Sequence, residues 1–277
     1  MRSVLSVLFV VVSPLLAAAD ESSNPAFLGV GMHDLGSNPN GMAGPCVIDT
    51  VTRDSGAHVA GLRGGDIMIA LDTTPIPNCD ALVKAIQDRE AGQHVKIEIQ
   101  RSGIATTLEA NLPSRADVLR KRFVGKPMPL TTLMRVEDES VGDLTSRGKT
   151  TIVGWFDQSR CTNCASAFAK INDWIKAKGK SAPIAIYGVT TASSMSVPET
   201  AKNLKMAQRN FDVPLMVADI ETFGELSITD VKRIHFMVID CRGIVSYVTP
   251  LKPDADDRSA ILEEIYAATD QAARRMK

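Results

Sequence analysis

The chain has 277 residues, a formal net charge of −1 from 31 Lys and Arg against 32 Asp and Glu, and 44% hydrophobic residues. Such a length suits one large or two modest domains, and the near-neutral charge argues against a nucleic-acid-binding protein, which normally carries a basic surplus. The 19 Gly and 14 Pro are ordinary for a globular protein and exclude collagen, coiled coils and bulk disorder.

The first nineteen residues predict export from the cytoplasm. A basic start at Arg2, an apolar run over Val4–Leu16 and small residues ending at Ala19 are typical of a signal peptide cleaved near Ala19. An uncleaved anchor helix is the alternative, but the apolar run is shorter than the roughly 20 residues that span a bilayer, and Pro14 interrupts it. We therefore expect a periplasmic or secreted protein, in a compartment where disulfides persist.

Residues 25–113 have the pattern of short strands separated by glycines, with two short helices. Asn78 is a candidate N-cap for a helix that begins at Cys79. Apolar residues alternate in His94–Gln100, which predicts a half-buried strand. The other strands are expected from Cys46, over Ile67–Leu71 and over Ile104–Leu112. The segment is predicted to be a mostly-β module.

Several short motifs in this segment carry a resemblance to a known family. They are Phe27-Leu28-Gly29-Val30, Ser55-Gly56-Ala57, Ala60-Gly61-Leu62, Gly65-Asp66-Ile67 and Arg101-Ser102-Gly103. Together they resemble the PDZ domains attached to bacterial periplasmic trypsin-like proteases. The resemblance implies a peptide-binding site at Phe27, Leu28, Gly29 and Val30, where loop N–H groups meet a peptide carboxylate. The following strand and the helix from Cys79 would accept an added strand. Use of the module only as a docking or dimer surface is the alternative.

Residues 114–124 are predicted to join two domains. They lie between Pro113 and Gly125, contain four basic residues and have few apolar ones. A charge run of this length is usually solvated, so the segment is interpreted as a linker or a short solvated helix.

From residue 125 to residue 277 strands and helices alternate. This pattern predicts a central mixed sheet with helices on both faces. Strands are expected over Lys149–Phe156, Ile184–Val189, Pro214–Val217, Phe236–Ile239 and Ile244–Val248, and helices over Ala165–Lys178, Glu199–Asn210 and Ser259–Arg275.

Cys161 and Cys164 lie where the first of these strands passes into a helix. Residues three apart in a first helical turn share one face, so the two sulfur atoms can form a disulfide. A helix N-terminus and the adjacent Arg160 would favour the Cys161 thiolate. Cys161 is then the predicted nucleophile, and Cys164 the resolving thiol that completes exchange through a mixed disulfide.

The pair has two other interpretations, a metal site and a structural disulfide. Half of a zinc site is disfavoured because there is no second CxxC and the four histidines lack ligand spacing; no metal or cofactor is expected. A purely structural disulfide is the stronger alternative, although closing so short a loop stabilises a fold little.

The second domain resembles thioredoxin-like proteins, and among them the TlpA/ResA type of exported thiol-disulfide oxidoreductase. The resemblance rests on Gly125-Lys126-Pro127, on the CxxC and on Met237-Val238-Ile239-Asp240. It implies action on protein thiols or disulfides, recharged by a membrane electron donor. Four positions depart from the family. Arg160 replaces the usual Trp, Asp157 replaces an aromatic residue and Trp155 replaces a polar or acidic one. Ile234 stands where the family has a cis-proline facing the CxxC.

His235 follows Ile234 and is a candidate catalytic residue. If its loop faces the CxxC, its imidazole could exchange the proton that thiol chemistry needs. A histidine with no role, exposed or at the core edge, is the alternative.

The odd number of cysteines leaves at least one thiol without a partner in the chain. Cys46 and Cys79 either form a disulfide or are two small buried hydrophobic residues, and Cys241 is the predicted free thiol. The sequence thus predicts an exported thiol-disulfide oxidoreductase whose PDZ-like domain recruits a protein partner. A binding or scaffold protein with a catalytically weak thioredoxin-like domain is the alternative.

Overall fold

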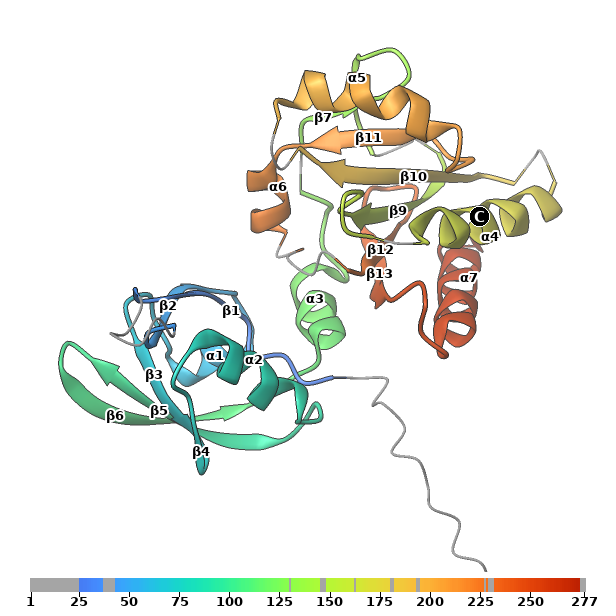
Figure 1. Ribbon diagram of the computed structural model, residues 1–277. Helices are drawn as coiled ribbons and strands as arrows, with labels where there is room; N and C mark the ends of the chain where they lie inside the picture. Colours follow the sequence, from blue (N-terminus) through green and yellow to red (C-terminus); the bar gives the residue numbers. More distant parts are fainter. Residues whose placement is uncertain are drawn as a thin grey trace, which may run out of the picture.

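A computed structural model describes residues 25–36, 43–129, 131–144, 148–161, 163–179, 182–192, 195–226, 228 and 232–274. The predicted signal peptide, residues 1–19, lies outside the described residues. Two domains are visible in Figure 1, a smaller one in blue to green and a larger one in green to red. This two-domain architecture is the one that the sequence predicts.

The first domain is built on one antiparallel sheet in the order β1-β2-β3-β5-β6, with β4 paired to β3. Its elements are β1 (Val30–Asp34), β2 (Cys46–Val51), α1 (Gly56–Ala60), β3 (Ile67–Leu71), β4 (Thr74–Pro75), α2 (Cys79–Gln87), β5 (His94–Arg101) and β6 (Ile104–Asn111). β1 pairs only with β2, so its other side is an edge of the described sheet.

Local sequence signals explain where these elements begin. The Asn78 side chain accepts a hydrogen bond from the N–H of Ala81 at 2.9 Å and caps α2, as predicted. In β5 the side chains of Val95, Ile97 and Ile99 are buried and their neighbours are exposed, which confirms the period-2 pattern.

Residues 114–124, predicted as a linker or a solvated helix, contain α3 (Arg115–Phe123). Ser114 caps this helix, since its hydroxyl accepts from the N–H of Asp117 at 3.0 Å. Leu119 and Phe123 are buried among residues of the second domain, and α3 lies between the two domains in Figure 1. The four basic residues of the segment favoured the prediction of a solvated helix, but its buried apolar residues pack against the second domain instead.

The second domain has a mixed sheet in the order β13-β12-β9-β10-β11-β7-β8. β9, β10 and β11 are parallel, and β12, β13, β7 and β8 are joined through antiparallel pairs. Its elements are β7 (Leu133–Arg135), β8 (Val141–Gly142), β9 (Thr150–Phe156), α4 (Cys164–Ala177), β10 (Ile184–Thr191), α5 (Val197–Gln208), β11 (Leu215–Ala218), α6 (Ile220–Glu225), β12 (Ile234–Ile239), β13 (Val245–Leu251) and α7 (Arg258–Arg274).

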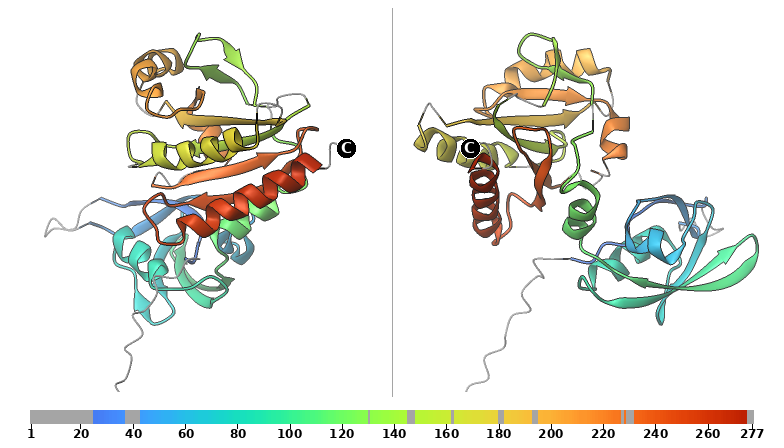
Figure 2. Two further views of the ribbon diagram at one scale, coloured as in Figure 1. Left: turned by 90° about the vertical axis from the view of Figure 1, so that its right-hand side faces the viewer. Right: turned by 180° about the vertical axis from the view of Figure 1, so that it is seen from behind.

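Two buried clusters lie on the two faces of this sheet. We call the first the α4 face, because it packs residues of α4, α5 and α7 against the sheet, including Phe168 and Ile265. The second, the α3 face, packs residues of α3 and α6, including Phe123 and Phe223. Figure 2 shows α4 and α7 side by side along one face. The second domain therefore has one mixed sheet with helices on both faces. This is the α/β fold predicted from the resemblance to thioredoxin-like proteins.

Within the described ranges, the helices are all too short or too polar to cross a membrane.

Candidate functional site

The loop that precedes β1 holds the residues predicted to meet a peptide carboxylate. Phe27 donates its N–H to the carbonyl of Pro113 at 2.8 Å, while the carbonyls of Leu28 and Gly29 accept from Ala57 and Thr52 at 2.9 and 2.8 Å. Within the described chain, the N–H groups of Leu28 and Gly29 donate to no backbone carbonyl. The loop is therefore held by the N–H of Phe27 and by two carbonyls, and the N–H groups of Leu28 and Gly29 are left as neighbouring donors for a ligand.

Gly29 is required by the geometry of this loop. Its φ is +84°, a left-handed conformation that favours glycine. A Cβ added there would lie 2.3 Å from the Cβ of Ser55. Both the backbone conformation and this close approach therefore exclude a larger residue.

α2 lies alongside β1, and a hydrogen bond near each end of the helix links it to β1 or to the segment just before β1. Beyond the C-terminus of α2, the carbonyl of Arg89 accepts from the N–H of Ala26 at 3.3 Å. At the other end the carboxylate of Asp34 accepts from the N–H of Cys79 at 2.7 Å. We refer to the unpaired side of β1 together with the adjacent α2 as the β1–α2 edge.

Both elements of the β1–α2 edge carry apolar side chains. Val30 and Met32 are half-buried against the core of the domain, and Val83 on α2 is 39% exposed. Such an edge offers unpaired main-chain groups beside apolar contacts, which is what an added peptide strand needs. Sequence reasoning missed Met32 and Asp34, although the period of a strand beginning at Val30 places both on the same side as Val30.

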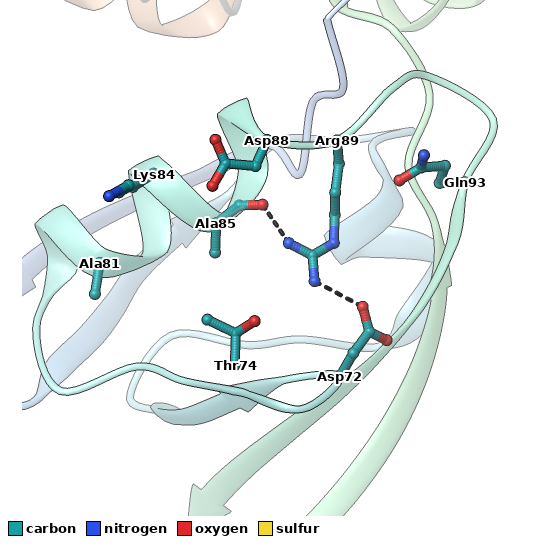
Figure 3. A pocket seen from close by; sticks show the side chains of 8 residues that line it. All are labelled: Asp72, Thr74, Ala81, Lys84, Ala85, Asp88, Arg89 and Gln93. Carbon is teal, nitrogen blue, oxygen red and sulfur yellow. Dashed lines mark hydrogen bonds and ion pairs between the residues drawn. The ribbon is translucent and has the colours of Figure 1, made fainter.

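A polar pocket of about 550 Å³ lies elsewhere on α2 (Figure 3). In this pocket the guanidinium of Arg89 donates to the carboxylate of Asp72 at 2.7 Å and also to the carbonyl of Ala85. These charged groups satisfy one another, so the pocket is a weaker candidate for ligand binding than the β1–α2 edge.

Cys46 and Cys79 form a disulfide, with Cα atoms 4.7 Å apart. Of the two possibilities that the sequence left open, a disulfide or two buried thiols, the structure has the disulfide. Cys46 lies in the core with no exposed surface. The free cysteine of the described chain is Cys241, as predicted.

Cys161 and Cys164 form the second disulfide, with Cα atoms 5.7 Å apart. The preceding turn is fixed by Asp157, whose carbonyl accepts from the N–H of Cys161 at 2.9 Å and whose carboxylate accepts from Ser159 at 2.9 and 2.6 Å. Cys164 is 1% exposed, whereas Cys161 is partly exposed. An incoming sulfur atom therefore reaches Cys161 more readily, and the roles of Cys161 as nucleophile and Cys164 as resolving thiol stay predictions.

The structure differs from the prediction in where the helix begins. α4 begins at Cys164, after Asn163 with a φ of +62°, so Cys161 precedes the first helical turn instead of opening it. The positive φ at Asn163 interrupts helical geometry between the two cysteines. Any effect of the helix dipole therefore falls mainly on Cys164.

Arg160 is mostly exposed, and its Nε lies 3.9 Å from the carboxylate of Asp157. The negative charge of Asp157 thus offsets part of the positive charge of Arg160, which was predicted to favour the Cys161 thiolate. The structure places Arg160 beside the dithiol, and its predicted effect on the Cys161 thiolate stays a prediction.

His235 lies on the other face of the sheet from the dithiol. It pairs in register with Trp155, which belongs to the α3 face, whereas Cys164 packs on the α4 face. His235 has no exposed surface, so it is neither exposed nor at the core edge. Strand alternation in β12 explains the difference, because the neighbouring Phe236 and Ile234 take the α4 face.

The segment around Ile234 also differs from the family. Ile234 is buried and is the first residue of β12. No peptide bond within the described residues is cis. The structure thus brings together Arg160, Cys161 and Cys164 and keeps the His235 side chain apart from them.

Residues 26–112 match the family model of the PDZ domain, and no curated protein matches the chain. The HtrA-type protease AlgW with a decapeptide is 26% identical over 33% of this chain and 30% of its own, with a TM-score of 0.30.

Two further structures are similar to parts of the chain. The PDZ domain of HtrA3 bound to a phage-derived ligand (FGRWV) is 16% identical over 31% of this chain and 84% of its own, with a TM-score of 0.27. A structure from Bacteroides thetaiotaomicron, provisionally named a protein disulfide isomerase, is 20% identical over 53% of this chain and 90% of its own, with a TM-score of 0.39. The family match and the fold identify the first domain, residues 26–112, as a PDZ domain.

Proposed function

We propose that this is an exported, periplasmic or secreted protein whose PDZ domain binds the C-terminal residues of a protein partner at the β1–α2 edge. The observation that carries the proposal is the side of β1 that pairs with no other strand of the described sheet. Just before β1, the N–H groups of Leu28 and Gly29 donate to no backbone carbonyl of the described residues. A peptide carboxylate at these donors, followed by an antiparallel strand along β1, would satisfy main-chain groups on both partners.

A second activity, thiol-disulfide exchange, is supported by the Cys161–Cys164 disulfide. In the reduced protein, the Cys161 thiolate would attack a substrate disulfide, form a mixed disulfide and release one substrate thiolate. The Cys164 thiolate then attacks Cys161, releases the second substrate thiolate and restores the Cys161–Cys164 disulfide. Two electrons pass to the substrate, and the released thiolates take up protons from solvent. A thiol reductant, such as a membrane electron donor, would recharge the pair.

Peptide binding is tested with a library of heptapeptides that carry free C-terminal carboxylates. We expect the full chain to select peptides, to bind them much more weakly as C-terminal amides, and to lose affinity on Val83→Glu at the exposed surface of α2. Ile104→Glu is the matched control, because Ile104 is 69% exposed on β6, the opposite edge of the sheet. Equal binding of acids and amides would contradict carboxylate recognition at the loop.

Thiol exchange is tested by insulin reduction with dithiothreitol as the electron source. We expect the full chain to accelerate the reaction and Cys161→Ala to abolish the acceleration, whereas Cys241→Ala leaves it unchanged. A chain that never accelerates the reaction, or a Cys161→Ala variant that still does, would favour the alternative of a binding or scaffold protein with a catalytically weak second domain.

A further inference from the structure

The Cys46–Cys79 disulfide lies at the end of the β1–α2 edge that is distant from the carboxylate loop. Cys46 is the first residue of β2 and pairs in register with Asp34, the last residue of β1. Cys79 is the first residue of α2. The disulfide therefore joins the sheet beside the edge strand directly to the helix that flanks it.

Two further contacts extend this link to β1. Asp34 accepts from the N–H of Cys79 at 2.7 Å, and the Sδ of Met32 lies 3.5 Å from the Sγ of Cys46. Met32 is one of the apolar residues of the β1–α2 edge. The disulfide thus holds the N-terminus of α2 against β1 and also supports a side chain that a bound peptide would touch.

We propose that the Cys46–Cys79 disulfide positions α2 for peptide binding, so that the affinity of the β1–α2 edge depends on the oxidation state of this pair. The inference rests on the proposed peptide-binding function and adds its regulation. When the disulfide is formed, α2 already has its position beside β1 before a peptide binds. Binding then does not have to supply the free energy that orders it.

Reduction requires a dithiol as the electron donor. Its thiolate attacks one sulfur of the pair, the Cys46–Cys79 bond breaks, and the second donor thiolate closes a disulfide within the donor. The pair gains two electrons and two protons, and the donor is oxidised by the same amount. Cys46 has no exposed surface and Cys79 is 9% exposed, so the attack requires a local opening at the start of α2. The Asp34 hydrogen bond then remains to hold the helix end.

The test uses the full chain with Cys161→Ser and Cys164→Ser, which leaves Cys46–Cys79 as its one internal disulfide. The probe is the tightest heptapeptide from the library described above, labelled with fluorescein at its N-terminus and followed by anisotropy. Mass spectrometry after N-ethylmaleimide treatment in denaturant verifies the oxidation state. We expect dithiothreitol to raise the Kd about tenfold, equivalent to about 1.4 kcal/mol, and reoxidation with diamide to restore it.

An unchanged Kd with Cys46 and Cys79 verified as reduced would overturn the inference and leave the proposed peptide binding intact. No binding in either state, by any library peptide, would refute the proposed function itself. Hydrogen exchange of β5, which pairs with β3 on one side and β6 on the other, distinguishes loss of α2 positioning from unfolding of the domain. Partial loss of β5 protection is expected, because the disulfide also stabilises the folded domain. Weaker binding in a chain whose β5 amides exchange as fast as in the denatured state would overturn the inference, because the domain would then be unfolded.

Two variants test the same inference without a reductant. Cys46→Ala with Cys79→Ala is expected to reproduce the weak affinity of the reduced chain and to be insensitive to dithiothreitol. Should this variant not fold, Asp34→Ala keeps the disulfide and removes only the hydrogen bond to Cys79. In the oxidised state, we expect the Asp34→Ala chain to bind the peptide more weakly than the chain with Asp34, by a factor smaller than the tenfold change on reduction. Reduction of the Asp34→Ala chain should weaken its binding further. Retention of full affinity by Asp34→Ala in both states would overturn the inference.

Discussion

Replacing Cys46 and Cys79 by alanine should destabilise the PDZ domain far more than opening the other disulfide destabilises the second domain. The two cysteines are separated by 33 positions, and the chain-entropy relation gives about 3.8 kcal/mol for a loop of this size. Cys161 and Cys164 are separated by 3 positions, for which the same relation gives about 1.9 kcal/mol. The longer loop restricts the unfolded chain more, which is the reason for the difference.

The distribution of aromatic residues allows the two domains to be followed separately. Both tryptophans, Trp155 and Trp174, and all three tyrosines lie beyond residue 124. Tryptophan fluorescence therefore reports the second domain, whereas hydrogen exchange of β2 and β5 reports the first. In guanidinium titrations, the alanine pair should lower the free energy of unfolding of the first domain by about 3–4 kcal/mol and leave the fluorescence transition of the second in place.

Two results would refute this reasoning. A loss below about 1 kcal/mol would mean that the disulfide does not restrict the unfolded chain as the loop length requires. A shift of the fluorescence transition as large as the shift for the first domain would mean that the two domains unfold together, because α3 packs between them. A chain with Cys161→Ala and Cys164→Ala is the matched control for the loss of a disulfide elsewhere in the protein.

Three further predictions follow from named contacts. In the reduced chain, iodoacetamide should label Cys161 before Cys164, because Cys164 is 1% exposed; peptide mass mapping measures the order, and equal rates would contradict the assigned roles. Burial would raise the pKa of Asp66, but hydrogen bonds from Arg101 and from the N–H of Arg63 outweigh it and lower the pKa. The stability from this ionised pair is therefore present above the unfolded pKa of about 3.9 and is lost as the pH falls through the folded pKa. Asp66→Asn should lower the free energy of unfolding by about 2 kcal/mol near pH 7 and reduce its dependence on pH in the acid range. An unchanged dependence on pH in that range would contradict the prediction. Gly154→Ala should destabilise the second domain by about 1–3 kcal/mol, because a Cβ there would lie 2.5 Å from Phe168; urea unfolding followed by fluorescence checks it, and a neutral effect would show that the core repacks.

The sequence predicted the elements whose pattern is local. Strand β3 and the start of α2 follow from an apolar run and an N-cap, and β9 and α4 follow from period and length. The proximity of Cys161 and Cys164 also followed from their short motif, whereas the prediction that Cys161 opens the helix was wrong because Asn163 takes a positive φ. Where the predictions were confirmed, the local pattern and the tertiary contacts favour the same conformation.

Features that depend on distant parts of the chain could not be predicted in the same way. α3 packs on the second domain through Leu119 and Phe123, and a charge run alone does not show that partner. The orientation of His235 depends on the register of β12 against β9, which the surrounding loop does not reveal. The role of Met32 at the β1–α2 edge emerges once β1 is known to be an edge strand.

The central claim, that a peptide carboxylate binds at the loop before β1, is tested most directly by NMR on the ¹⁵N-labelled chain. The library-selected heptapeptide is added as the free acid and, in a second titration, as the amide. The account predicts that the largest shifts with the acid fall on the N–H groups of Leu28 and Gly29, with smaller ones along β1 and α2, and that the amide produces little change. Shifts centred on the pocket that contains Arg89 and Asp72, or equal shifts with acid and amide, would contradict it.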